Sequence, residues 1–214
     1  MTLVILGASG HGREAAACIR ALSAIESTWD DLAGYLDDDR TKWGTTIAGL
    51  PVLGGIDLLS TASFRAVLGV GYPRVKSRVL ARAMTTGATW PAVIDPRARV
   101  GSGVRVGRGS FVQAGCILTT DIDVGEFSTI NIGATVSHDC RLGRLATICP
   151  GVHVGGNVDI DEGAFVGIGA SITHGVVIGK WSVVGAGAAV IRDVPPNTVV
   201  AGVPARALRS PVEG

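Results

Sequence analysis

Between Ile94 and Val190, an aliphatic residue recurs at every sixth position, 17 times in succession without an insertion. A second series lies four residues after each of these positions and contains only Ala, Ser, Cys, Val or Ile, from Ala98 to Val194. A period of six fits neither an α-helix nor a strand that simply alternates its side chains. It is the hexapeptide repeat typical of a parallel β-helix, in which each short strand forms one side of a coil.

The repeat also predicts how each coil is built. The strand points its aliphatic side chain inward, and the smaller residue four positions later faces inward near a corner. In eight of the 17 repeats Gly directly follows the aliphatic residue, as at Gly125, and we expect it there because glycine adopts the positive φ that corners need. If three hexapeptides form a triangular coil, the run makes between five and six coils, which stack at about 4.7–4.9 Å.

Hydrophobic stretches ahead of the repeat alternate with helical patterns. Strands that alternate with helices predict a small parallel α/β domain. We expect strands at 2–8, 33–39 and 64–71, helices at 13–25 and 73–87, and a turn-rich segment without assignment at 44–55.

The chain therefore divides into three parts. Residues 1–90 form the α/β domain and residues 91–194 the β-helix. Pro195 and Pro196 block a further coil, so we expect residues 195–214 to form a tail that packs back onto the β-helix.

Composition narrows the classes of partner. The chain has 19 basic and 18 acidic residues, a net charge of +1, so it encodes no strong attraction to nucleic acid or to an anionic membrane. No apolar stretch approaches the about 20 residues of a membrane span, and the N-terminus lacks the basic region of a signal peptide. The four cysteines form no CxxC pair or metal-like cluster, which favours a reducing, cytoplasmic compartment.

The motif GASGHG, residues 7–12, lies between the first strand and the first helix. Phosphate groups bind well at helix N-termini next to strand ends. Its spacing is not the dinucleotide pattern G-x-G-x-x-G, so a mononucleotide or nucleotide-sugar diphosphate is the better ligand, and a plain tight turn is the alternative. Asp37 and Asp38 close the second strand, where a carboxylate meets a ribose or base unless the pair is only a solvated turn.

Two histidines occupy the same position in the repeat. His138 and His174 lie 36 residues apart, so they belong to one outward column about 10 Å apart. His138 is followed by Asp139, a carboxylate that fixes the tautomer and raises the basicity of an imidazole. We therefore expect His138 to be a general base, with His174 as the alternative. Cys140 belongs to the inward series and is a poor nucleophile, and no three-histidine metal site is expected.

Four motifs together resemble the sugar O-/N-acetyltransferase family of hexapeptide-repeat acyltransferases, which includes sialic acid O-acetyltransferases and bacillosamine- and perosamine-type N-acetyltransferases. The motifs are GASGHG at 7–12, LDDD at 36–39, SHDCRLG at 137–143 and AGVPAR at 201–206. The resemblance covers essentially the whole chain. It implies a Rossmann-like α/β domain, a left-handed β-helix, and a homotrimer that binds acetyl-CoA in the groove between adjacent subunits.

The resemblance also implies roles for individual residues. The catalytic histidine falls on His138 and its supporting acid on Asp139. Gly156 lies one coil after His138, so its N–H is expected to stabilise the oxyanion. Thr147 and Ala186 stand where a relative has His and Gly, so we expect backbone contacts there. The expected substrate-binding residues are Ser9, Gly10, His11, Asp37, Asp38 and Gly71, and the acetyl-CoA contacts are Thr147, Ile168 and Ala186.

The sequence thus predicts an acetyl-CoA-dependent N-acetyltransferase that acts on a nucleotide-linked amino sugar. One alternative is an O-acetyltransferase of sialic acid or another sugar, and a second is a non-catalytic β-helix scaffold that binds only a nucleotide. For the trimer interface we expect an uncovered apolar face that carries Phe111, Phe127 and Phe165.

Overall fold

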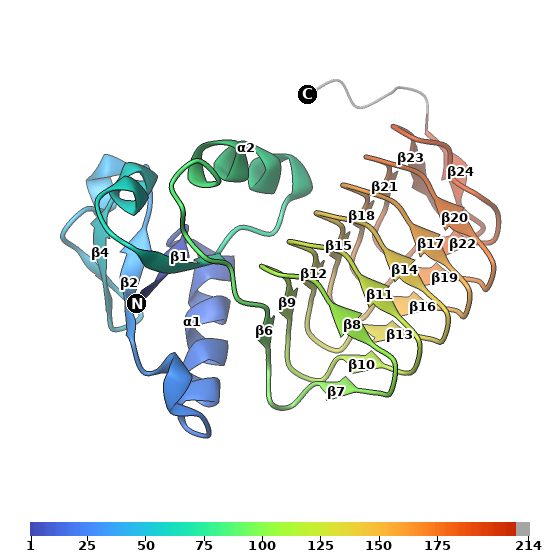
Figure 1. Ribbon diagram of the computed structural model, residues 1–214. Coiled ribbons are helices and arrows are strands. Elements are labelled where there is room, and N and C mark those ends of the chain that lie inside the picture. Colours follow the sequence, from blue (N-terminus) through green and yellow to red (C-terminus); the bar gives the residue numbers. More distant parts are fainter. Residues whose placement is uncertain (209–214) are drawn as a thin grey trace. The chain divides into compact units, whose positions relative to one another are not determined.

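The computed structural model describes residues 1–208, and its chain forms two compact units (Figure 1). The first unit comprises Met1–Pro96 and the second begins at Arg97, shortly after the expected boundary at residue 90. Residues 209–214 of the expected tail lie outside the described residues.

The first unit is an α/β sheet domain, as predicted. Its sheet has the order β3-β4-β2-β1-β5, in which β1 pairs parallel with β2 and β5, and β2 pairs parallel with β4. The unit contains β1 (Thr2–Leu6), α1 (Gly10–Ser23), η1 (Ser27–Trp29), β2 (Leu32–Leu36), η2 (Arg40–Lys42), β3 (Thr46–Ile47), β4 (Leu50–Gly54), η3 (Ile56–Ser60), β5 (Phe64–Leu68) and α2 (Pro73–Ala83). It ends with β6 (Val93–Ile94), which does not belong to this sheet.

Strand β1 is the centre of this sheet. Leu3, Val4, Ile5 and Leu6 are all 0% exposed, which is typical of a parallel strand that is covered on both faces and reads as one apolar run. The carboxyl end of β1 therefore leads directly from the core to the start of α1.

The segment 44–55 holds a hairpin that the sequence pattern did not predict. Strand β3 pairs antiparallel with β4, and the turn between them contains Ala48 and Gly49 with φ of +49° and +74°. Two residues of positive φ in a two-residue loop match the twist of a hairpin. The sequence gives only a weak indication of this hairpin, because alanine rarely adopts a positive φ.

The second unit is a left-handed β-helix of two-residue strands, and its three faces are seen as three ladders in Figure 1. Face I contains β7 (Arg99–Val100), β10 (Ile117–Leu118), β13 (Thr135–Val136), β16 (His153–Val154), β19 (Ser171–Ile172) and β22 (Ala189–Val190). Face II contains β8 (Arg105–Val106), β11 (Asp123–Val124), β14 (Arg141–Leu142), β17 (Asp159–Ile160) and β20 (Val177–Ile178). Face III contains β9 (Phe111–Val112), β12 (Thr129–Ile130), β15 (Thr147–Ile148), β18 (Phe165–Val166), β21 (Val183–Val184), β23 (Val199–Ala201) and β24 (Arg206–Ala207).

The interior of the coil matches the predicted repeat. From Val112 to Val190 every sixth residue is at most 4% exposed, and so is every member of the second series from Ser110 to Val194. Strands 18 residues apart pair in parallel, as where Thr135 pairs with His153. Each buried large aliphatic side chain contributes about 1.5–3 kcal/mol, so this column is the main support of the unit.

The reason expected for the glycine after the aliphatic residue is wrong. Gly125 does not have positive φ; instead, a Cβ atom there would lie 2.7 Å from the backbone nitrogen of Arg144 in the next coil. Glycine is needed at this position because stacked coils approach each other closely. The left-handed residues come two positions later, as at Asp139 with φ of +58°.

The tail extends the β-helix instead of only covering it. Strand β23 pairs parallel with β21, and β24 pairs antiparallel with β23. The prolines at 195 and 196 end the regular repeat, but the N–H groups further along the chain remain available for two more strands on face III.

Candidate active site

His138 and Asp139 lie at the corner between face I and face II, in the turn that joins β13 to β14. The left-handed φ of Asp139, which Asp tolerates better than most residues, places its Oδ2 atom 2.7 Å from Nδ1 of His138. Their side chains are 58% and 61% exposed. Because a carboxylate only accepts hydrogen bonds, Nδ1 carries the proton and Nε2 remains the basic nitrogen that a general base requires.

Gly156 lies under the ring of His138 in the next coil. A Cβ atom at Gly156 would be 2.6 Å from both Cε1 and Nε2 of His138, so the imidazole occupies the space that a side chain would fill. The Gly156 carbonyl accepts a hydrogen bond from the Gly175 N–H at 3.0 Å, whereas the Gly156 N–H donates none within residues 1–208. The structure thus places a basic nitrogen beside a backbone donor.

Two other candidates at this corner lack such an arrangement. His174 is followed by Gly175 instead of a carboxylate. Cys140 is 1% exposed, and its Sγ atom lies 3.1 Å from the carbonyl oxygen of Gly155. Burial raises the pKa of the Cys140 thiol, which disfavours the thiolate that a nucleophile needs.

The GASGHG turn has the form of an anion site. Ser9 is the N-cap residue of α1, its side chain makes no cap hydrogen bond, and the first turn holds no acidic residue. The turn can be tight because Gly12 has no side chain. A Cβ atom at this position would lie 2.0 Å from the carbonyl oxygen of Gly7. The N–H groups in the first turn of a helix favour a phosphate, and the Asp37 carboxylate already accepts the N–H of Ala8 in this motif.

His11 and Gly71 come together beside this turn. A Cβ atom at Gly71 would lie 3.7 Å from the ring of His11, and His11 Nδ1 is 3.1 Å from Glu14 Oε2. The structure therefore gathers Ser9, Gly10, His11 and Gly71 around the carboxyl ends of β1 and β5.

Asp37 holds its own chain in place. Its carboxylate accepts hydrogen bonds from the N–H groups of Ala8 and Asp39 at 2.8 and 2.9 Å, and Lys42 Nζ lies at 3.0 Å. Burial, the largest single influence, raises the pKa of Asp37, but these hydrogen bonds and Lys42 together outweigh it and lower the pKa. Asp37 thus ties the end of β2 to the GASGHG turn.

Asp38 points into a hollow of about 550 Å³ beyond the ends of β2 and β4. It accepts a hydrogen bond from the Ile56 N–H at 3.2 Å and pairs with Arg82. Trp43, Asp57 and Arg82 also line this hollow. These three residues come from separate segments of the chain, so no motif joins them, and only the acids of LDDD indicate a site here.

The acetyl-CoA contacts expected from the resemblance lie on other parts of the β-helix. Ile168 and Ala186 lie at the corner between face III and face I, and Ile168 is 60% exposed. Thr147 is in β15 on face III and is 2% exposed. Within one chain, face I separates the corner of Ile168 from the corner of His138.

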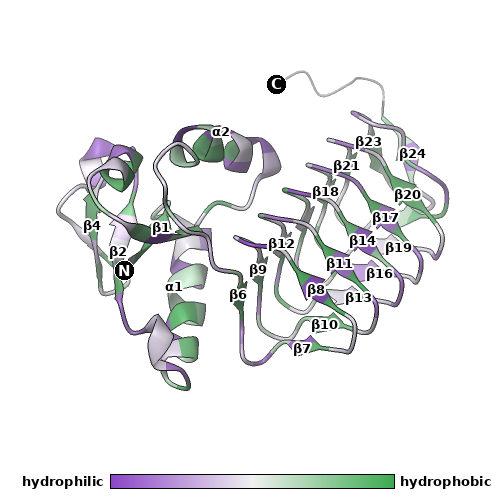
Figure 2. Cartoon of the chain, viewed as in Figure 1, coloured by the Kyte–Doolittle hydropathy of each residue, from purple (hydrophilic) through white to green (hydrophobic). Residues whose placement is uncertain are grey.

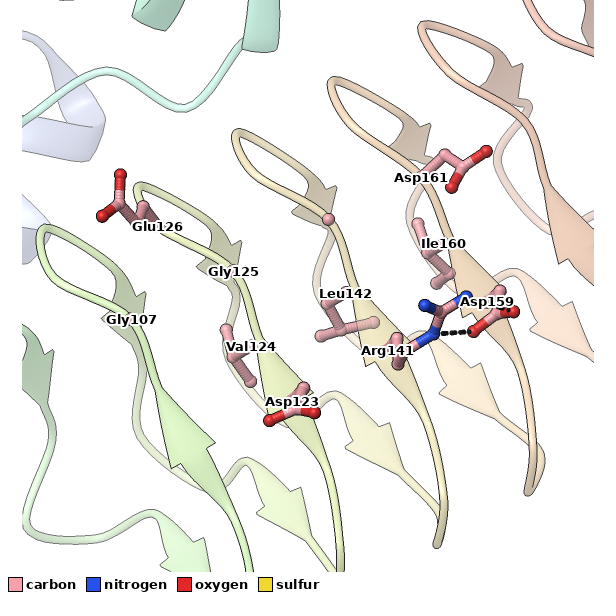
Figure 3. Close-up of a pocket in the computed structure, with 11 residues that line it drawn as sticks. Gly107, Asp123, Val124, Gly125, Glu126, Arg141, Leu142, Asp159, Ile160 and Asp161 are labelled. Carbon is pink, nitrogen blue, oxygen red and sulfur yellow. Dashed lines mark hydrogen bonds and ion pairs between the residues drawn. The ribbon is translucent and has the colours of Figure 1, made fainter.

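Face II is covered by paired charges. From β8 to β17 the outward side chains alternate in sign from coil to coil, with Arg105 bound to Asp123 at 2.6 Å and Arg141 to Asp159 at 2.7 Å. Figure 2 shows the hydrophilic residues recurring along β8, β11, β14 and β17. Figure 3 shows the hollow of about 450 Å³ on this face, where Arg141 and Asp159 lie side by side. None of the expected site residues line it.

The three phenylalanines expected on an exposed interface face are not exposed. Phe111 and Phe127 are 3% and 1% exposed, and Phe165 is half-buried. The ring of Phe127 lies between the guanidinium groups of Arg108 and Arg144, at 5.9 and 5.8 Å from its centroid. These side chains therefore fail to provide an exposed patch. No helix in the described part of the chain is long and apolar enough to cross a membrane.

Comparison with protein families gives two matches. Residues 2–83 match the PglD N-terminal domain, and residues 98–120 and 158–192 match the hexapeptide repeat of succinyl-transferase. Among curated proteins, none matches the chain.

Solved structures resemble the chain over nearly its full length. A histidine-to-alanine mutant of GDP-perosamine N-acetyltransferase from Caulobacter crescentus, in complex with CoA and GDP-perosamine, is 32% identical, with a TM-score of 0.89 and 98% of each chain covered. The acetyltransferase domain of PglB from Neisseria gonorrhoeae, in complex with acetyl coenzyme A, is 31% identical, with a TM-score of 0.86 and 97% and 98% coverage of this chain and that one. WeeI from Acinetobacter baumannii is 31% identical, with a TM-score of 0.87 and 97% and 100% coverage.

Proposed function

Because the chain belongs to the hexapeptide-repeat sugar N-acetyltransferases, we propose that it transfers the acetyl group of acetyl-CoA to the amino group of a nucleotide-linked amino sugar. The observation that carries this proposal is the exposed pair of His138 Nδ1 and Asp139 Oδ2 at 2.7 Å. The structures of similar enzymes with CoA and GDP-perosamine support it.

In the proposed reaction His138 is the general base. The sugar amine attacks the thioester carbon of acetyl-CoA, and Nε2 of His138 accepts the proton that the amine loses. Asp139 stabilises the imidazolium through Nδ1. The new C–N bond forms, the C–S bond breaks, and the CoA thiolate leaves and takes up a proton. No acyl-enzyme is required, in keeping with the buried Cys140.

The Gly156 N–H is proposed to stabilise the oxyanion that develops on the thioester oxygen. Its support is the position of His138 over Gly156, which places a backbone donor near the basic nitrogen. Pre-oriented donors of this kind lower the barrier because they cost no reorganisation during the reaction.

The first unit is proposed to bind the nucleotide. The start of α1 at Ser9 and Gly10 receives the diphosphate, with His11 and Gly71 beside it. The open cap of Ser9 and the tight turn at Gly12 support this assignment. Asp38 is proposed to face the ribose or base of the nucleotide. Asp37 holds the GASGHG turn through its hydrogen bond with the Ala8 N–H.

We propose further that the active form is a homotrimer with its sites between subunits. The corner of His138 and the corner of Ile168 lie at opposite edges of face I, which supports a site shared between neighbouring chains. If three copies pack face I toward a three-fold axis, the His138 corner of each chain meets the Ile168 corner of the next. The outward residues of face I, Arg99, Ile117, Thr135, His153, Ser171 and Ala189, include a single Asp, Glu, Lys or Arg residue.

The proposed compartment is the cytoplasm, because the four cysteines are all free and structural thiols persist in reducing conditions.

The deciding experiment measures CoA release. Purified protein with acetyl-CoA should release free CoA only when a nucleotide-linked amino sugar is added, and the product should gain one acetyl group by mass spectrometry. Mild alkali separates the remaining alternatives, since it cleaves an O-acetyl ester and leaves an amide. An alkali-labile product would mean O-acetylation, and no CoA release with any sugar nucleotide would mean a non-catalytic scaffold.

A further inference from the structure

We propose that the hollow beside Asp38 receives the nucleobase of the sugar nucleotide and that Asp57 and Arg82 select guanine there. This inference rests on the proposed function, because it names a part of the same substrate. It concerns only the first unit, whose residues line the entire hollow.

The position of the hollow follows from the order of the sheet. The proposed diphosphate site lies at the end of β1, and β2 and β4 are the next strands in one direction. The hollow begins at Asp38, after β2, and continues past Gly54, the last residue of β4. A nucleotide whose phosphates lie at α1 and which extends along the carboxyl ends of parallel strands brings its base into this space. Its volume of about 550 Å³ lies within the usual range for small-molecule sites.

Trp43 provides a rigid surface on which a base can stack. Its indole N–H donates to the carbonyl oxygen of Asp37 at 2.7 Å. Its edge fits against Gly55, where a Cβ atom would lie 3.2 Å from the ring. The guanidinium of Arg40 lies 5.5 Å from the ring centroid, and the side chain is still 43% exposed. A fixed, partly exposed indole binds a planar base at little cost in conformational entropy.

The polar groups of the hollow match guanine. Arg82 pairs with Asp38 and with Oδ1 of Asp57, the latter at 2.7 Å. The Asp57 side chain is 89% exposed, and among residues 1–208 its Oδ2 atom accepts no hydrogen bond. A carboxylate accepts from the adjacent N1–H and 2-amino group of guanine, and an arginine beside it donates to O6.

The other bases match the hydrogen-bonding groups of Asp57 and Arg82 less well. Uracil and thymine have one N–H donor on the corresponding edge, and adenine presents an acceptor at N1 that a carboxylate repels. Only guanine offers two adjacent donors to Asp57 and an acceptor to Arg82. We therefore expect the hollow to distinguish guanine from the other bases through the acceptor Asp57 and the donor Arg82. Stacking on Trp43 is expected to favour every base alike.

The test is calorimetric binding of GDP, IDP, UDP, dTDP and ADP to the full chain without acetyl-CoA. GDP should bind at least about tenfold more tightly than UDP, dTDP or ADP, as one good paired contact to a base allows. IDP, which lacks only the 2-amino group, should bind more weakly than GDP. In Asp57→Asn the affinity for GDP should fall about tenfold, the difference between GDP and IDP should disappear, and UDP should change by less than about twofold.

Two variants serve as controls. Trp43→Ala should weaken all five nucleotides by a similar factor, about tenfold, and Asp30→Asn, an exposed carboxylate outside the hollow, should change none. Equal binding of UDP and GDP, or an equal loss for all nucleotides in Asp57→Asn, would overturn the inference. These measurements need no acetyl transfer. If the chain selects guanine but releases no CoA, the proposed function is wrong and the inference about the hollow still holds.

Discussion

The imidazole ring of His138 lies over Gly156 of the next coil, so close that a methyl group on Gly156 would stand 2.6 Å from Nε2. This contact joins the proposed base to the proposed oxyanion donor. Space for the ring exists only because residue 156 has no side chain, and the orientation of the ring is set from the other side by Asp139 at 2.7 Å.

We predict that Gly156→Ala lowers kcat by about 10²-fold, since a displacement of roughly 1 Å has such an effect on a positioned group. The melting temperature should change little, because the ring can swing into solvent. In a His138→Ala background the same substitution should have no further effect, since the ring it displaces is gone. Additive losses in the double variant would show that Gly156 does not act through His138.

His138→Ala should keep the fold and lower kcat by about 10²–10⁴-fold, the usual contribution of a general base. The matched control is His174→Ala, which removes the same side chain from the same corner two coils further along. Steady-state CoA release measures both. Loss of turnover in His174→Ala with normal turnover in His138→Ala would reverse the assignment.

Asp37→Asn should destabilise the first unit at neutral pH by about 1–3 kcal/mol, because the carboxylate receives two backbone N–H groups and Lys42. The lowered pKa of Asp37 means that the folded state favours the ionised form. Its contribution is therefore full above the ordinary Asp pKa of 3.8 and is lost as the pH falls through the lower folded pKa.

Thermal melts of wild type and Asp37→Asn should accordingly differ most near pH 7 and converge on acidification below the ordinary pKa. A difference that stays constant across this range would show that the ionised carboxylate is not the stabilising species.

Ser9→Ala and Asp38→Ala should raise KM for the sugar nucleotide while leaving KM for acetyl-CoA within about twofold, because both residues lie in the first unit and uniform binding contributes to KM alone. Initial rates at varied concentrations of each substrate provide the comparison. An unchanged KM for the sugar nucleotide in both variants would move the nucleotide site elsewhere.

Mixed trimers should recover activity from two inactive parents. His138→Ala and Ile168→Glu damage opposite edges of face I, so a site built from an intact His138 of one chain and an intact Ile168 of the next remains whole. Random mixing through unfolding and refolding should restore about a quarter of wild-type activity, as expected for a cyclic trimer with shared sites. Each parent refolded alone is the control. A fully active monomer in light scattering would contradict the proposal.

The hexapeptide repeat was enough to predict the β-helix and the alignment of its columns. A period of six puts equivalent residues 18 positions apart, so the inward series from Val112 to Val190 and the shared column of His138 and His174 followed without any knowledge of long-range packing. Because each coil packs mainly against the coils directly before and after it, its structure depends on residues that are near in sequence. A repeat of such residues can be recognised from the sequence.

Side-chain contacts and backbone conformation set what the stacking of coils does not specify. The left-handed φ of Asp139 turns its carboxylate onto Nδ1 of His138, and the lack of a side chain at Gly156 gives the ring its place. Phe127 proved buried between two arginines, contrary to the expected exposed face. In the first unit Trp43, Asp57 and Arg82 line one hollow only because the end of η2, η3 and α2 come together in the fold. Such contacts depend on the packing of distant segments, which no repeat encodes.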